Sequence, residues 1–221
     1  MKISSLLLSW VLAVNLTACT DAKKAFSLGG SAYQVPADYL VISPSSFEST
    51  DFDDNISMVA LTFNNDKDFS DYMEPNSWLP GSSITAILYA REGTSLTGFS
   101  PSLSSLVEFS VDGENIIEFE NSYRIFQGDT RISWQALPKS QASFDGDKVT
   151  AKWVADCIPL GGMRGSEQSH ESIDIPTSCK INIEYRNSIL RLSTSEKNLL
   201  DNAEKITALM LQKLDSWRVH P

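Results

Sequence analysis

Short apolar stretches separated by polar turn residues run through most of the chain and predict an antiparallel β-sheet. Within residues 148–158, Val149, Ala151 and Trp153 alternate with mostly polar neighbours, which is the period of a strand with one face in a core and one in water. Gly, Asn and Asp residues between the stretches indicate turns. The strands expected on this basis are residues 39–43, 56–63, 84–90, 106–111, 116–119, 123–126, 131–137, 148–158, 178–185 and 189–192.

Two features between these strands predict local structure. Asp112-Gly113 is a hairpin signal, and it predicts that residues 106–111 pair with residues 116–119. The connection from Asp66 to Ser83 is long and irregular, and we expect one helical turn near residues 68–73 within it.

The C-terminal segment changes to a helical period. Ser193-Thr194-Ser195-Glu196 is a capping box that marks the start of a helix. The polar face of this helix mixes acids and bases, so packing on the sheet is favoured over lying on a membrane, which selects a basic face. We therefore expect an α+β fold: a mainly antiparallel β-sheet domain, sandwich-like or a single curved sheet, with a C-terminal amphipathic helix packed on it. The apolar stripe recurs at spacings of three and four: Leu199, Ala203, Ile206, Met210, Leu214 and Trp217.

Composition indicates a folded chain with an acidic surface. Hydrophobic residues make up 42% of the 221 residues and aromatic residues 10%, whereas disordered chains lack the apolar content for a core. The net charge of −10 disfavours nucleic acid and anionic lipid head groups as partners. Residues 33–221 suit a single β-rich globular domain, and the small and polar residues 19–32 predict a flexible tether ahead of it.

The N-terminus has the pattern of an export signal. Met1-Lys2 precedes an apolar stretch from Ile3 to Val14 that only serines interrupt, and this stretch is shorter than the roughly 20 residues that span a bilayer. Leu16-Thr17-Ala18-Cys19 follows and resembles the lipobox of bacterial lipoproteins. The resemblance implies that residues 1–18 are a signal peptide and that Cys19 is acylated, for instance with palmitate. An ordinary secretory signal with a chance cysteine is the alternative.

The residues after the lipobox also bear on location. By the same resemblance, the protein is anchored through lipid on the periplasmic side of the bacterial envelope. Thr20 stands where an aspartate would resemble the signal for retention in the inner membrane. The resemblance therefore favours the outer membrane over the inner membrane.

The other two cysteines form an even pair once Cys19 is assigned to lipid. In an oxidising compartment, a disulfide between Cys157 and Cys179 is the expected state. A redox-active or metal-binding pair is the alternative, but the sequence has no Cys-x-x-Cys and no His at ligand spacing beside either cysteine. We expect a structural disulfide.

The motifs of catalysis and cofactor binding are missing from the sequence. There is no Gly-x-Ser-x-Gly elbow and no glycine-rich phosphate loop, and His170 and His220 lie in a polar loop and at the chain end. Asn64, Asp66 and Asp68 have the spacing of calcium ligands, but Phe69 stands where a calcium loop needs glycine. We expect no enzyme activity, no cofactor and no metal site.

Two acidic loops with interleaved aromatic residues are the candidate binding surface for a basic protein partner. Aromatic anchors inside a charged rim are typical of tight interfaces. The alternative is that these aromatic residues belong to the core. The residues proposed for partner binding are Asp51, Asp53, Asp54, Asp66, Asp68, Asp71 and Trp78.

The overall layout gives a second resemblance. The lipobox, the Tyr33-x-x-Pro36 opening of a strand, the sheet and the capped helix that ends in Trp217 are similar to those of small periplasmic immunity lipoproteins that neutralise type VI secretion effectors. The resemblance implies a protein that binds a toxic effector and blocks its active site. An envelope-assembly or secretion-apparatus scaffold is the alternative, followed by a small-ligand binder or hydrolase.

Overall fold

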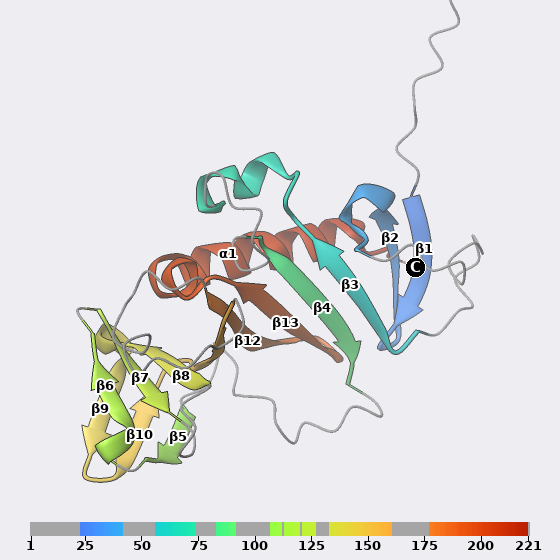
Figure 1. The fold of residues 1–221 in the computed structure, drawn as a ribbon. Coiled ribbons are helices and arrows are strands. Elements are labelled where there is room, and N and C mark those ends of the chain that lie inside the picture. The colour runs from blue at the N-terminus through green and yellow to red at the C-terminus, as the bar shows by residue number, and fades with distance from the viewer. Residues whose placement is uncertain are drawn as a thin grey trace, which may run out of the picture.

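The computed structural model describes a mainly antiparallel β-fold with one long C-terminal helix packed on it, which confirms the expected α+β class (Figure 1). The described residues are 23–41, 56–73, 83–91, 107–111, 113–119, 121–126, 133–160 and 177–220.

An eight-stranded antiparallel sheet forms the centre of the described structure. Its strands lie in the order β3-β4-β13-β12-β11-β8-β7-β6, so β3 and β4, from the first half of the sequence, form one edge and pair with β13 near the C-terminus. The strands are β3 (Met58–Thr62), β4 (Thr85–Ala90), β6 (Ile116–Glu118), β7 (Ser122–Phe126), β8 (Trp134–Pro138), β11 (Ala155–Pro159), β12 (Thr177–Tyr185) and β13 (Ser188–Thr194).

Helix α1 (Glu196–Trp217) covers this sheet with the face that the sequence predicts. All six residues of the apolar stripe are buried, from Leu199 at 1% exposure to Trp217 at 8%. The helix begins two residues later than the capping box implies, because Ser195 is the N-cap and its hydroxyl accepts a hydrogen bond from the amide of Asn198. In the described part of the chain, no helix has both the length and the apolar character needed to cross a membrane.

The first strands contradict the predicted tether. Strand β1 (Lys23–Leu28) pairs antiparallel with β2 (Ser31–Pro36), and Phe26 and Leu28 are 1% and 0% exposed. The prediction that residues 19–32 are a flexible tether is therefore wrong from Lys23 onward. The physical reason is that two alternating apolar side chains suffice to fix a strand when a hairpin partner supplies the rest of the buried face. Residues 19–22 lie outside the described residues.

A second, smaller sheet has the order β5-β10-β9, from β5 (Val107–Ser110), β10 (Lys148–Ala151) and β9 (Ala142–Asp145). It has its own hydrophobic cluster with β7 and β8, which includes Val111, Ile125 and Leu137. The hairpin predicted at Asp112-Gly113 is wrong, because β5 pairs with β10 while β6 pairs with β7.

Two further expectations about strands are wrong. Residues 148–158 form β10 and β11, which belong to different sheets, because Trp153 and Val154 are both buried and break the alternation. Residues 39–41 of the strand expected at 39–43 form the end of a 3-10 turn, η1 (Ala37–Tyr39), and a single bridge from Leu40 to Leu61, and residues 42 and 43 lie outside the described residues. The expected helical turn near residues 68–73 is present as the 3-10 helix η3 (Lys67–Tyr72). Two more short turns are η5 (Gly113–Asn115) and η6 (Lys139–Gln141).

The turn between β1 and β2 yields a test of the hairpin. Gly29 and Gly30 have φ values of +59° and +76°, where side chains other than glycine are strained. A Cβ on Gly29 would also lie 2.7 Å from Ser188 Oγ and 2.8 Å from the carbonyl oxygen of Asn187, whereas one on Gly30 would meet nothing within 4 Å.

We expect Gly30→Ala to lower the free energy of unfolding by about 1 kcal/mol, the cost of the left-handed backbone alone. Gly29→Ala should cost about 2–4 kcal/mol, because the steric clash adds to that strain. Urea unfolding followed by tryptophan fluorescence measures both. Equal losses in the two variants would contradict the packing of this turn against the connection between β12 and β13.

Candidate functional site

The predicted cysteine pair is joined in the structure. Cys157 on β11 lies directly opposite Cys179 on β12, with 4.1 Å between their Cα atoms, and the two form a disulfide. Both residues are fully buried. The bridge therefore ties two neighbouring strands in the middle of the large sheet.

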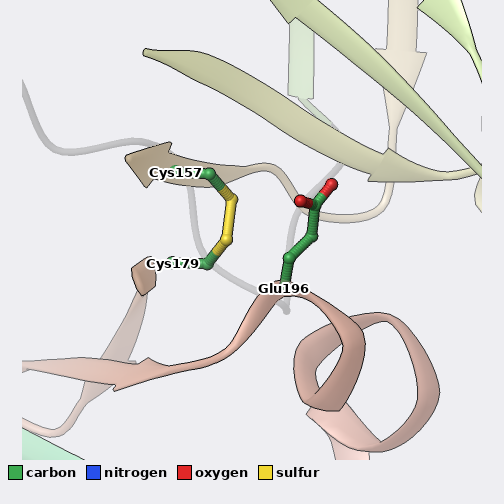
Figure 2. Close-up of side chains that lie close together, drawn as sticks. All are labelled: Cys157, Cys179 and Glu196. Carbon is green, nitrogen blue, oxygen red and sulfur yellow. A yellow bond between two sulfur atoms is a disulfide. The ribbon is translucent and has the colours of Figure 1, made fainter. Parts of the chain in front are cut away.

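Glu196 lies beside this disulfide, as Figure 2 shows. The two sulfur atoms and a carboxylate oxygen of Glu196 all lie within 4.8 Å of one another. Metal binding requires thiolates, which a disulfide does not offer. The carboxylate of Glu196 is itself bound to Arg124, so in this oxidised form the three side chains do not constitute a metal-binding group.

The Arg124–Glu196 ion pair is a buried arrangement that sequence reasoning missed. Arg124 Nε donates to Glu196 Oε1 at 3.0 Å, and Arg124 Nη2 lies 2.8 Å from Oε2. The two side chains are only 2% and 6% exposed. The guanidinium also lies 4.3 Å and 4.5 Å from the ring centres of Phe119 and Trp134, which stabilises its charge through cation–π contacts.

The geometry gives this pair a structural role rather than a catalytic one. Arg124 is on β7 and Glu196 is the first residue of α1, and the amide of Glu196 donates to Thr177 Oγ1 on β12 at 3.1 Å. The pair thereby fixes the helix start over the sheet. The sequence signal for this buried pair is the position of Arg124 between apolar residues in the strand expected at 123–126.

Breaking this pair should be costly, whereas replacing both partners should not. Glu196→Gln leaves the Arg124 cation buried without its counter-ion, and we expect a loss of about 3–5 kcal/mol. The double variant Arg124→Met, Glu196→Leu should recover most of that loss, because both desolvation costs disappear. Chemical unfolding of both variants measures this, and a double variant no more stable than Glu196→Gln would argue against it.

Of the predicted partner-binding acids, Asp66 is part of an internal cluster. Its side chain is 4% exposed, and Lys213 Nζ on α1 lies 3.0 Å from Asp66 Oδ2 and 2.7 Å from Asp68 Oδ2. Tyr39 donates its hydroxyl proton to Asp66 Oδ2 at 2.8 Å, and the amide of Asp68 donates to Oδ1 at 2.9 Å. Asp66 is thus the N-cap of η3 and the anchor of η3 on the helix, and it is not available as a free surface charge.

The protonation of this cluster follows from these contacts. Burial alone would raise the pKa of Asp66, but the hydrogen bonds from the Asp68 amide, Lys213 and Tyr39 outweigh it and lower that pKa. Burial and the hydrogen bond to Asp66 raise the pKa of Tyr39 to about 12. Burial would lower the pKa of Lys213, yet its bonds to Asp68 and Asp66 raise it. At neutral pH Asp66 is therefore charged and is held by Lys213.

The other residues predicted for partner binding fall into three groups. Asp68 and Asp71 are exposed on η3, and their role in partner binding stays a prediction. Phe69 is fully buried and Tyr72 packs against the main core, so these two aromatic residues serve the fold. Cys19, Asp51, Asp53, Asp54, Trp78 and His170 lie outside the described residues.

The charge on Asp66 should contribute pH-dependent stability. Asp66→Asn keeps a side-chain oxygen for the Asp68 amide but removes the charge that Lys213 and Tyr39 contact, so we expect a loss of about 1–2 kcal/mol at pH 7. Because the pKa of Asp66 is lowered on folding, this contribution is present above its unfolded value of 3.8 and is lost as pH falls through the folded pKa.

Urea unfolding of the wild type and Asp66→Asn between pH 7 and pH 2 measures this difference. Asp68→Asn is the matched control, since the Asp68 side chain is 56% exposed and its neutralisation should change stability far less. A difference for Asp66→Asn that stays constant down to pH 2 would contradict the assignment.

A cavity of about 290 Å³ lies between the small sheet and strands β7 and β8. Its lining contains no titratable side chain: Phe109, Ser110, Val111, Asn115, Ile125, Phe126 and Gln135. The described histidine, His220, is exposed and contacts Arg218 at 3.1 Å. Among the described residues, neither the cavity nor His220 brings a nucleophile and a base together. The cavity contains the side-chain amides of Asn115 and Gln135, which could bind a ligand by hydrogen bonds.

Comparisons with known proteins add a distant likeness. No family model and no curated protein matches the chain. Smlt3025, an immunity protein of the Stenotrophomonas maltophilia type IV secretion system, is 13% identical, covers 90% of this chain and 94% of its own, and has a TM-score of 0.40. FrpD, the iron-regulated outer membrane lipoprotein of Neisseria meningitidis, is 9% identical, with coverage of 89% and 92% and a TM-score of 0.37. At these TM-scores, neither likeness carries a functional argument.

Proposed function

We propose that this chain is a lipid-anchored protein on the periplasmic side of the bacterial envelope and that it protects a cell by binding and blocking an antibacterial effector. Cys19 carries the anchor, and the outer membrane is the favoured location. The expected partner is a type VI secretion effector with a basic surface. The chain binds this partner without catalysing a reaction and without a cofactor.

The observation that carries the anchor is Leu16-Thr17-Ala18-Cys19 behind a basic and apolar N-terminus. The disulfide between Cys157 and Cys179 supports export, because disulfides form in oxidising compartments such as the periplasm. With two of the three cysteines used in that bridge, Cys19 is the cysteine left for lipid.

The division of the charged groups into internal ion pairs and exposed acids supports binding to a basic protein. The buried charges of Arg124, Glu196 and Asp66 are engaged in ion pairs, Arg124 with Glu196 and Asp66 with the partly exposed Lys213, and these pairs hold α1 to the rest of the fold. Of the predicted partner-binding acids that the structure describes, Asp68 and Asp71 are exposed. Exposed acidic groups speed the encounter with a basic protein, which is how an inhibitor reaches a toxin early.

Co-expression with the effector gene that lies beside this gene tests the proposal. We expect the chain to protect cells from that effector and to co-purify with it. Protection without co-purification, or co-purification without protection, would overturn the immunity role. In the second case, a scaffold role would become the better account.

Charge variants identify the surface that binds. We expect Asp51→Asn, Asp53→Asn, Asp54→Asn to slow association with the effector about tenfold at low salt. The matched control removes three exposed acids elsewhere, Glu108→Gln, Asp145→Asn, Asp147→Asn, and should leave the rate within about twofold. Equal effects of the two triple variants would point to long-range charge alone rather than to a binding site at residues 51–54.

A further inference from the structure

We infer that the β1–β2 hairpin rests on the surface of a bilayer with anionic phospholipid head groups, and that the small sheet faces away from it. This inference rests on the lipid anchor at Cys19 in the proposed function. It adds to that function the face of the domain that meets the membrane.

The connection between Cys19 and strand β1 is short. Strand β1 begins at Lys23, only four residues after Cys19. An extended chain spans at most 3.3–3.6 Å per residue, so the Cα of Lys23 lies within about 14 Å of the Cα of Cys19. A domain of about 200 residues has a radius of gyration of about 16 Å, which exceeds that reach. The surface around the start of β1 is therefore held against the head groups.

The hairpin is fixed to the rest of the fold, so its contact orients the whole domain. Tyr33 and Val35 are buried in the main core together with Phe26 and Leu28. The amide of Ile56 donates to the carbonyl of Ser27 at 3.0 Å, and the amide of Val219 donates to that of Ala32 at 2.9 Å. Figure 1 shows the hairpin at one end of the molecule and the small sheet of β5, β9 and β10 at the other.

The distribution of charge favours the same orientation. Strands β1 and β2 contain Lys23 and Lys24 and no acid, so the hairpin itself is positive, and the acids Asp21 and Asp38 lie before and after it in the sequence. The small sheet and its turn hold three acids against one lysine: Glu108, Asp145, Asp147 and Lys148. An anionic surface attracts the β1–β2 hairpin and repels the small sheet, although the net charge of the whole chain is −10.

Energy transfer to the membrane tests this orientation. The full lipidated chain is placed in vesicles of phosphatidylethanolamine and phosphatidylglycerol that contain an acceptor-labelled lipid. A donor dye is attached at Gln34→Cys on β2 or at Ser143→Cys on β9, both exposed positions. Because Cys157 and Cys179 form a disulfide and Cys19 is acylated, the introduced thiol is the one that reacts. We expect at least threefold more efficient transfer from position 34.

Equal transfer from the two positions, or more from position 143, would overturn the orientation. Vesicle flotation separates this result from a failure of the anchor: a chain that floats but shows equal transfer is anchored without orientation. A chain that does not float contradicts the proposed function as well as this inference. Twelve Gly and Ser residues inserted between Ala22 and Lys23 should reduce the difference between the positions, because they restore a long tether.

Charge variants test the role of the lysines. Lys23→Gln, Lys24→Gln should reduce the difference in transfer at least twofold in vesicles with phosphatidylglycerol. Lys67→Gln, Lys205→Gln, which removes the same charge from exposed residues outside both the hairpin and the small sheet, should leave the difference unchanged. Equal reductions in both variants would overturn the attraction of the hairpin to the anionic surface.

Discussion

Burial of the apolar face of α1 on the eight-stranded sheet is the contact on which the fold depends, and the Arg124–Glu196 pair decides where that contact begins. An apolar face alone allows a helix to slide along a sheet. A buried ion pair prevents this sliding, because any shift of the helix leaves two desolvated charges unpaired. The amide of Glu196 also donates a hydrogen bond to Thr177 Oγ1, and Thr177 lies two residues before the disulfide-bonded Cys179. The helix start, β7 and the β11–β12 pair are thus held as one unit.

The sequence predicted those parts of the fold that local periodicity determines. The α+β class, the buried stripe of α1 and most strands follow from spacings of two or of three and four residues. The pairing of strands does not follow from these spacings, because tertiary packing determines it. Strand β5 pairs with β10, which is distant in the sequence, and not with its sequence neighbour β6. Strand β1 was missed for the same reason, since its two apolar residues become significant only beside β2 and the main core.

The candidate site was predicted only in part, because charge along a sequence differs from charge in space. Asp66, Asp68 and Asp71 form an acidic run, yet Lys213 comes from the C-terminal helix to bind the first two. Of this run, Asp66 belongs to the interior and Asp71 to the surface. Arg124 and Glu196 lie 72 residues apart and could not be paired from spacing. The cysteine pair was predictable because the assignment of Cys19 to lipid left Cys157 and Cys179 as partners for each other.

The structured hairpin changes what an anchor at Cys19 would do. A long flexible tether lets a domain present any face to an arriving protein, and the local concentration near the membrane is then its main effect. A connection of three residues between Cys19 and a strand that is packed in the core restricts the domain to few orientations. Acidic groups and the cavity between the small sheet and strands β7 and β8 then lie at the end remote from the hairpin. A lipid surface that holds the hairpin would leave the small sheet and this cavity open to the periplasm, so a molecule that binds there would not compete with the membrane.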